Sequence, residues 1–281
     1  MIAAGAFLTA AAALLLLSPW LLTGGRWQVR HPRTALTAWF AVFGGGIAAA
    51  LASVAAAILA AVSGGTAATA AEAVTVTLVA WVSLGGVGAV LAFISLSAEP
   101  LSQSWRASLA RYAPAVSRRE QHPGYTLVWF DAPELFACAV PGRHPEILVS
   151  TALQDALTIR QLQAVIAHEH AHLRLGHGWA VRIAELNALC LPRMLRAGRD
   201  MKRSTLLLVE LIADDTAAGQ VGAVHLANAL AALAKTTNDP GLELRAERLT
   251  LRRWKPPTRR HLPQLAIRPT DAAVERIGGT Y

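Results

Sequence analysis

Charged residues are scarce in this chain. They make up 16% of its 281 residues, whereas an ordinary soluble protein has about 25%. Hydrophobic residues account for 54%, and the mean hydropathy is +0.39. This excess of apolar residues indicates membrane-spanning segments before any motif is considered. The length leaves room for one or two domains.

Cysteine is also scarce. The two cysteines, Cys138 and Cys190, are too few for a disulfide framework and lack the spacing of a zinc-binding cysteine motif. Both have apolar neighbours, so we expect them to behave as small buried hydrophobic residues. Cysteine usage therefore gives no argument for an oxidising compartment.

Lysine is nearly absent, so arginine supplies most of the net charge of +8. Such a charge is typical of nucleic-acid-binding proteins or of loops beside an anionic membrane. The arginines cluster next to hydrophobic segments or in the C-terminal third, without the interleaved aromatic residues that stack on bases. We therefore expect contact with the lipid bilayer and no direct binding of nucleic acid.

Three long uncharged segments occupy the first hundred residues, at 2–22, 34–62 and 74–97. Each exceeds the roughly 20 residues that a helix needs to cross the hydrocarbon core. The first segment is comparable in length to a signal peptide, but it lacks a preceding basic region and two further segments follow it. The sequence therefore predicts a three-span transmembrane region over residues 1–98.

Basic residues flank these segments unevenly. The connector after the first segment and the stretch after the third are basic, whereas the connector between the second and third has no basic residue. Basic loops stay on the cytoplasmic side. We therefore expect a multi-pass protein of the plasma membrane, with its N-terminus outside and everything after residue 98 in the cytoplasm. The basic residues are Arg26, Arg30, Arg33, Arg106, Arg111, Arg118 and Arg119.

Residues 99–255 read as a cytoplasmic α+β domain. Short apolar runs at 125–130, 135–140 and 147–150 are separated by turn residues, a pattern that predicts a meander of strands. Proline-rich composition predicts an extended or disordered tail over residues 256–281.

The pattern turns helical after the last strand. Ser150 or Thr151 can cap a short helix ending near residue 157, and Thr158 can cap a helix over 159–177. Further helices are predicted over 204–218 and 221–235. The apolar stretch 179–195 contains Arg182, Glu185 and Arg193, which are costly in lipid, but it remains a candidate for lying on the membrane surface.

A His-Glu-x-x-His motif lies on the predicted helix 159–177. Because His168 and His172 are four residues apart, they share one helical face and can both bind one Zn²⁺ at about 2.0–2.1 Å. Glu169 lies on the flank of that face, where a general base can reach a zinc-bound water. The alternative is an exposed His/Glu-rich helix, but the apolar flank at 163–167 favours a buried one, in which these polar residues need partners. His170 lies two residues from His168 and faces away.

A catalytic zinc site needs a third protein ligand and leaves the fourth position for water. A metzincin would carry histidine and glycine where Gly178 and Leu175 stand, so that class is not expected. Glu185 is a possible carboxylate ligand. Glu210 is the better candidate, because it begins a Glu-x-x-x-Asp pair in an apolar helical stretch. Asp214 can then accept a hydrogen bond from the outer nitrogen of a ligand histidine.

Four segments together resemble the membrane metallopeptidases of the BlaR/MecR antirepressor type, which are related to the heat-shock membrane protease and CaaX prenyl-protease group. The resemblance covers roughly residues 100–250. It implies a zincin-like (gluzincin) fold in which His168, His172 and Glu210 bind one zinc ion and Glu169 is the base. Asp214 matches the carboxylate one turn beyond the glutamate ligand. The segments are FACAVPG (136–142), ILVS (147–150), LQAVIAHEHAH (162–172) and ELIAD (210–214).

The resemblance also implies that a strand before the active-site helix offers its edge to an extended peptide, at residues 135–140 or 147–150. The β-lactam sensors continue into a further span and an external penicillin-binding domain, neither of which occurs in these 281 residues, so we do not expect direct drug sensing.

The function expected from these observations is a membrane-anchored zinc endopeptidase. Its substrate would be a cytoplasmic or membrane-proximal protein, and a transcriptional repressor is one candidate. A quality-control protease and a non-catalytic membrane sensor or scaffold are the alternatives. Arg245, Arg248 and His225 are candidates for stabilising the oxyanion. The substrate, the activating signal and the oligomeric state are left open.

Overall fold

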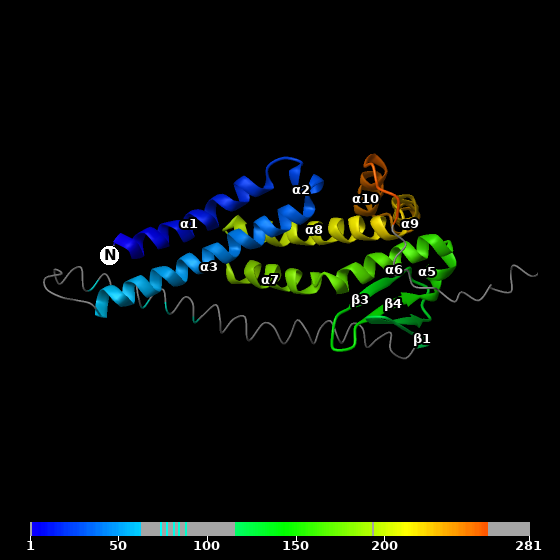
Figure 1. Ribbon diagram of the computed structural model, residues 1–281, viewed down its shortest axis with the longest axis horizontal. Coiled ribbons are helices and arrows are strands. Elements are labelled where there is room, and N and C mark those ends of the chain that lie inside the picture. The colour runs from blue at the N-terminus through cyan, green and yellow to red at the C-terminus, as the bar shows by residue number, and fades with distance from the viewer. Residues whose placement is uncertain are drawn as a thin grey trace, which may run out of the picture. The chain divides into compact units, whose positions relative to one another are not determined.

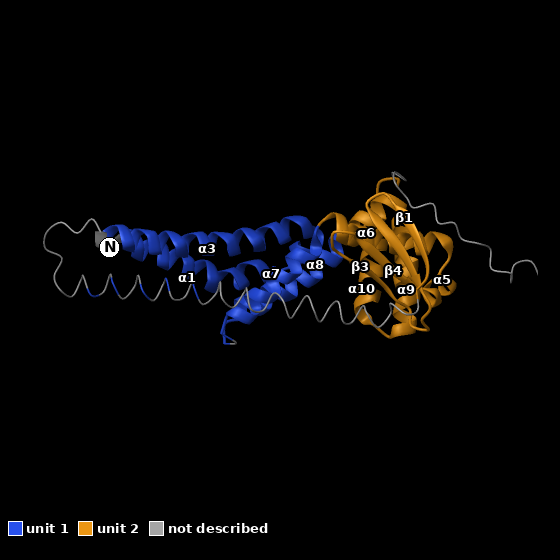
Figure 2. Cartoon of the chain, turned by 90° about the horizontal axis from the view of Figure 1, so that it is seen from below, with its two compact units in different colours: residues 1–111, 176–212 blue, residues 112–175, 213–281 orange. Residues whose placement is uncertain are grey.

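The computed structural model describes residues 2–62, 116–192 and 194–257, with five further positions between 74 and 88 (Figure 1). Most of the third predicted span, the stretch at 99–115 and the tail after 257 therefore lie outside the described residues. The chain forms two compact units (Figure 2). Unit 1 is Met1–Arg111 with Gly176–Ile212, and unit 2 is Tyr112–Leu175 with Ala213–Tyr281.

Unit 1 contains two long apolar helices, α1 (Ile2–Thr23) and α3 (Pro32–Val62), joined by the short α2 (Trp27–Arg30). Both are long and apolar enough to cross a membrane, and only 11% of each apolar window is buried. A core helix of a soluble protein would be mostly buried, so the outward-facing leucines and alanines indicate membrane association. The number of passes and the orientation stay predictions.

The other part of unit 1 is built from α7 (His177–Cys190) and the first half of α8 (Arg196–Val221). A Cβ at Gly198 would lie 2.9 Å from Cα of Ala188, so glycine lets the two helices approach closely. α8 begins at Arg196, eight residues before the predicted start at residue 204. The basic residues of this first stretch can belong to a helix because their side chains lie mostly on its exposed face. A buried cluster joins these helices to α3, and its members are Ala35, Trp39, Ala184, Met201 and Leu208.

Unit 2 is built on a four-stranded sheet with the order β1-β2-β4-β3. β2 pairs in parallel with β4, and the other two pairs are antiparallel. The predicted meander is therefore wrong, because β4 lies between β2 and β3 and leaves β3 at an edge. β1 has no counterpart among the predicted strands, because its alternating half-buried and exposed residues are mostly polar. The strands are β1 (Val116–His122), β2 (Tyr125–Phe130), β3 (Ala137–Val140) and β4 (Glu146–Ser150).

Side-chain caps begin the helices that follow the sheet. Ser150 accepts a hydrogen bond from the backbone N–H of Leu153 at the start of α5 (Thr151–Ala156). Thr158 forms a capping box with Gln161 at the start of α6 (Ile159–Arg174). The sequence predicted the Thr158 cap, and the structure selects Ser150 over Thr151 as the cap of α5.

The predicted helix 159–177 is in fact two helices. α6 ends at Arg174, and Gly176 with a φ of 65° introduces α7. Glycine adopts this left-handed conformation without the steric cost that a side chain brings. Two more helices complete unit 2. They are α9 (Ala223–Thr237), close to its predicted bounds, and α10 (Pro240–Leu251), which the sequence analysis did not predict.

α6 is buried on two sides within unit 2. Leu162, Val165 and Ile166 belong to a core with the apolar side chains of β2 and β4. Ala164 and Ala167 belong to a second core with α9, α10 and the last turns of α8. The helix that carries the His-Glu-x-x-His motif is therefore fixed before any ligand binds, which excludes the exposed His/Glu-rich helix as an interpretation.

Candidate metal centre

The two motif histidines face each other on α6. Their Nε2 atoms lie 3.1 Å apart, and the ring planes cross at 61°. Two nitrogens bound to one tetrahedral zinc at about 2.0–2.1 Å would be about 3.3 Å apart. His168 and His172 therefore already have the spacing of two ligands of a single ion.

Glu210 joins these histidines in the one group of potential metal ligands found among the described residues. The ligand atoms of His168, His172 and Glu210 all lie within 4.8 Å of one another. His168 is buried, whereas His172 and Glu210 are half-buried, so one side of the group remains accessible. Two imidazoles and one carboxylate form a donor set that suits zinc.

The alternative carboxylate, Glu185, has a different role. It forms an ion pair with Lys202 across α7 and α8, with 3.1 Å between Nζ and Oε1. The structure thus brings Glu210, and not Glu185, together with the motif histidines.

Asp214 lies on the other side of the His168 ring. Its side chain is 0% exposed, and Oδ1 is 3.0 Å from Nδ1 of His168. This is charge-pairing distance, although the ring N–H is not aligned with the oxygen as in an ideal hydrogen bond. A proton on Nδ1 faces the carboxylate in this arrangement, which leaves the lone pair of Nε2 directed toward His172 and Glu210.

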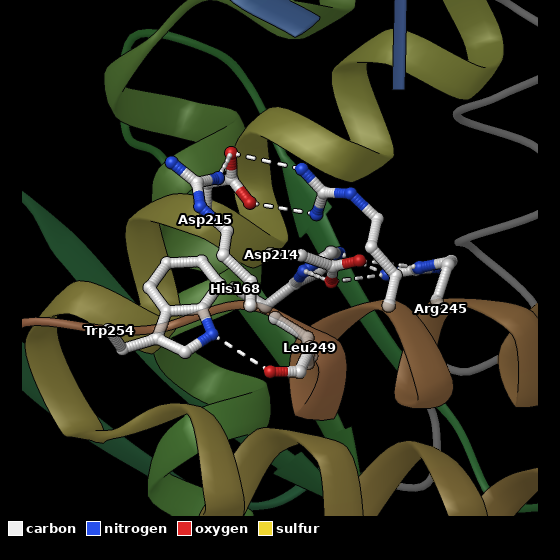
Figure 3. A network of polar contacts seen from close by, with 8 residues as sticks. His168, Asp214, Asp215, Arg245, Leu249 and Trp254 are labelled. Atoms are coloured by element: carbon white, nitrogen blue, oxygen red, sulfur yellow. Dashed lines mark hydrogen bonds and ion pairs between the residues drawn. The ribbon is translucent and has the colours of Figure 1, made fainter. Parts of the chain in front are cut away.

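Arg245 on α10 binds the same carboxylate (Figure 3). Its Nε donates to Oδ2 at 2.8 Å and its Nη2 to Oδ1 at 2.7 Å. Burial alone would raise the pKa of Asp214, but the hydrogen bonds from Arg245, the close contact with Nδ1 of His168 and the charges of both groups outweigh it and hold the pKa at about 2. Asp214 is therefore a permanent anion at neutral pH.

The next residue, Asp215, binds α10 in a similar way (Figure 3). Arg248 forms two hydrogen bonds to its carboxylate, at 2.8 and 3.2 Å, and Arg252 adds a third at 2.8 Å. Trp254 lies under the Arg252 guanidinium and donates to the backbone carbonyl of Leu249. Two consecutive aspartates of α8 thus hold α10 against it through ion pairs.

Arg245 and Arg248, which sequence reasoning offered as oxyanion-stabilising candidates, both have their guanidinium groups directed at aspartates. The available signal was the spacing of these two arginines on one face of a helix together with two adjacent acids. Without a predicted helix at 240–251, the sequence offered no reason to pair these arginines with the aspartates.

α6 packs against β3, and Glu169 on α6 lies close enough to this strand for its charge to act on Cys138. Burial, and secondly the negative charge of Glu169, raise the pKa of Cys138 on β3 to about 12. Cys138 and Cys190 are both half-buried free thiols, less buried than the sequence led us to expect.

His170 has a packing role away from the metal ligands. Its ring lies 4.8 Å from that of Tyr125, which in turn stacks on His122 at 5.2 Å. Burial, with a smaller effect of Arg174, lowers the pKa of His170, so its ring favours the neutral form against the sheet. The expectation that His170 faces away from the motif histidines agrees with this position.

Residues 100–245 match the sequence model of peptidase family M48. The chain belongs to this family. The match covers just over half of the sequence, including α6 and α8, and identifies the protein as a homologue of metallopeptidases. The narrower resemblance to the antirepressor type is not distinguished by this match.

A curated relative is the plastoglobule-localized metallopeptidase 48, chloroplastic, of Arabidopsis thaliana. It is 40% identical over 57 residues, which cover 20% of this chain and 17% of the relative. Because the chain matches so small a share of that protein, the similarity supports the peptidase domain alone. No solved structure matches the chain significantly.

Proposed function

We propose that this M48 homologue is a membrane-anchored zinc endopeptidase. His168, His172 and Glu210 would hold the zinc ion, Glu169 would act as general base, and Asp214 would orient His168. The observation that carries the proposal is the convergence of three ligand atoms within 4.8 Å, with the candidate base on the same helix. The two histidines alone have the separation that one tetrahedral ion requires.

The chain's own residues account for the proton transfers of peptide hydrolysis. When bound, zinc lowers the pKa of its water to about 7 and polarises the scissile carbonyl. Glu169 takes a proton from the attacking water and later delivers it to the leaving amine. The water oxygen ends in the new carboxyl group, so the peptide is cleaved without a covalent enzyme intermediate.

β3 is the best candidate for the substrate-binding strand. In the described sheet, β4 is paired on both sides, whereas β3 pairs with β4 alone. An extended peptide can therefore add beside residues 137–140, on a strand that packs against the motif helix α6. An open strand edge accepts an internal stretch of chain, which favours endopeptidase activity.

The proposed substrate is a membrane-proximal or cytoplasmic protein. The apolar α1 and α3 support attachment to the bilayer, and the basic connector at 26–33 supports a cytoplasmic peptidase domain. Regulatory cleavage of a repressor follows from the antirepressor resemblance, and clipping of damaged membrane proteins is the same chemistry on another substrate. Proteins that accumulate uncleaved in cells carrying Glu169→Gln would separate the two.

Metal analysis and peptidase assays of the full chain in lipid nanodiscs test the proposal. We expect one zinc per chain in the wild type, retention of zinc but loss of peptidase activity in Glu169→Gln, and loss of both in His172→Ala. His170→Gln is the matched control on the same helix and should keep both. A wild type without stoichiometric metal, or an active Glu169→Gln, would refute the proposal.

A further inference from the structure

We infer that Arg245 is a positioning residue for the metal centre, which acts by fixing the carboxylate of Asp214 and, through it, the ring of His168. The inference rests on the proposed zinc site and adds a residue that its ligand set and base do not include. It also assigns Arg245 a role different from the oxyanion contact that the sequence suggested.

Arg245 and Asp214 form a bidentate ion pair. Nε and Nη2 of Arg245 bind the two different oxygens of Asp214 at 2.8 and 2.7 Å. A bidentate arginine–carboxylate pair fixes the plane of the carboxylate as well as its position. The side chains of Asp214 and Arg245 are only 0% and 15% exposed, so water cannot readily replace the guanidinium.

The orientation of His168 depends on that plane. Oδ1, which receives Nη2 of Arg245, is also the oxygen 3.0 Å from Nδ1 of His168. Rotation of an aspartate carboxylate about its last bond is normally broad, and a turned carboxylate would no longer face Nδ1. The imidazole would then lose its preference for the tautomer with a free Nε2 lone pair, which is the form that binds metal.

A direct role for Arg245 at the reacting groups is the competing explanation. Nη2 also lies 3.4 Å from Nε2 of His168, so the cation is close to the metal-facing side of the ring. A residue that acts directly would change the catalytic rate without changing metal affinity or the His168 tautomer. The two explanations therefore predict different measurements.

Arg248 offers a matched control. It forms the same kind of bidentate pair with Asp215, and it fastens the same two helices through a different carboxylate. The side chains of Arg245 and Arg248 have nearly equal exposure, 15% and 13%. If the arginines serve only to dock α10 on α8, loss of either should affect the site equally.

The first measurement is the zinc affinity of the full chain in nanodiscs, by competition with a chelating dye. We expect Arg245→Met to weaken binding by about tenfold or more, in the range of outer partners of metal ligands. Arg248→Met should change the zinc affinity by less than about threefold. Arg245→Lys keeps the positive charge but cannot form the bidentate pair, so its zinc affinity should fall between those of the two methionine variants.

The second measurement needs neither metal nor activity. Nitrogen NMR of histidine-labelled, metal-free chain at about pH 8, above the ordinary imidazole pKa, reports which ring nitrogen carries the proton. His168→Gln assigns the signal. We expect the His168 proton on Nδ1 in the wild type and in Arg248→Met, and a tautomer mixture in Arg245→Met.

Three outcomes would overturn the inference. These are equal loss of zinc affinity in Arg245→Met and Arg248→Met, an unchanged tautomer in Arg245→Met, or a wild-type proton on Nε2. If Arg245→Met does not fold, Arg245→Lys carries the same comparison. If the wild type binds no zinc, but Arg245→Met still shows the expected change of the His168 tautomer relative to the wild type, the proposed function is refuted and the positioning role stands.

Discussion

Replacing Asp214 by asparagine removes a buried anion that two partners share. The side chain is fully buried, with Arg245 bound to both of its oxygens and Nδ1 of His168 at 3.0 Å. The amide of asparagine can accept one hydrogen bond from Arg245, but its NH₂ group opposes the second. The variant therefore leaves a poorly solvated guanidinium facing a donor.

The pKa of Asp214 sets the magnitude and the pH window. Its value of about 2 lies below the ordinary 3.8, and this difference corresponds to about 2–3 kcal/mol of stability. Because the folded-state pKa is the lower one, the contribution is complete above about pH 4 and is lost as the pH falls through about 2. Asparagine does not titrate, so the variant lacks this dependence.

Denaturant unfolding of the metal-free full chain in detergent micelles, followed by circular dichroism, measures the effect. The wild type should have the higher free energy of unfolding near pH 7, and its advantage over Asp214→Asn should shrink by about 2–3 kcal/mol as the pH falls to about 2. Chelator is included because bound metal would stabilise only the folded state. A gap that stays constant between about pH 5 and pH 2 would refute the assignment of Asp214 as an ionised partner of Arg245.

Three further changes test other parts of the structure. Glu210→Gln should weaken zinc binding by at least about tenfold, whereas Glu185→Gln, which removes the carboxylate that pairs with Lys202, should leave dye-competition values unchanged. Gly198→Ala places a Cβ 2.9 Å from a backbone atom of α7 and should lower the free energy of unfolding by about 1–3 kcal/mol. An unchanged melting curve would contradict the close packing of α7 and α8 at this position. Thr158→Ala removes the hydroxyl that accepts a hydrogen bond from the Gln161 backbone N–H and should lower the free energy of unfolding by about 0.5–2 kcal/mol, measured by urea unfolding, with Thr158→Ser retaining most of the stability.

Local features of the chain were predictable because each depends on neighbouring residues. The spacing of His168 and His172 places them on one face of any helix, and Ser150 and Thr158 cap helices through hydrogen bonds within three residues. Uncharged length alone identified α1 and α3 as membrane candidates. These are short-range consequences of backbone geometry and composition, and the structure agrees with them.

Strand order could not be read in the same way. β3 and β4 follow one another in the chain, yet β4 inserts beside β2 and leaves β3 at the edge. An apolar run shows that a strand is buried but does not show which strand lies beside it. The choice between the two candidate substrate strands therefore needed the tertiary structure.

The environment of His168 shows the same division. The sequence by itself predicted the histidine pair, the candidate base and the most suitable carboxylates, because motif spacing points to them. Only the tertiary structure revealed that Arg245 binds Asp214 beside His168, because Arg245 is 77 residues from His168 on a helix that no local pattern predicted. An arginine that solvates a surface and one that fixes a buried carboxylate look alike in sequence, since burial and distance depend on how the whole domain packs.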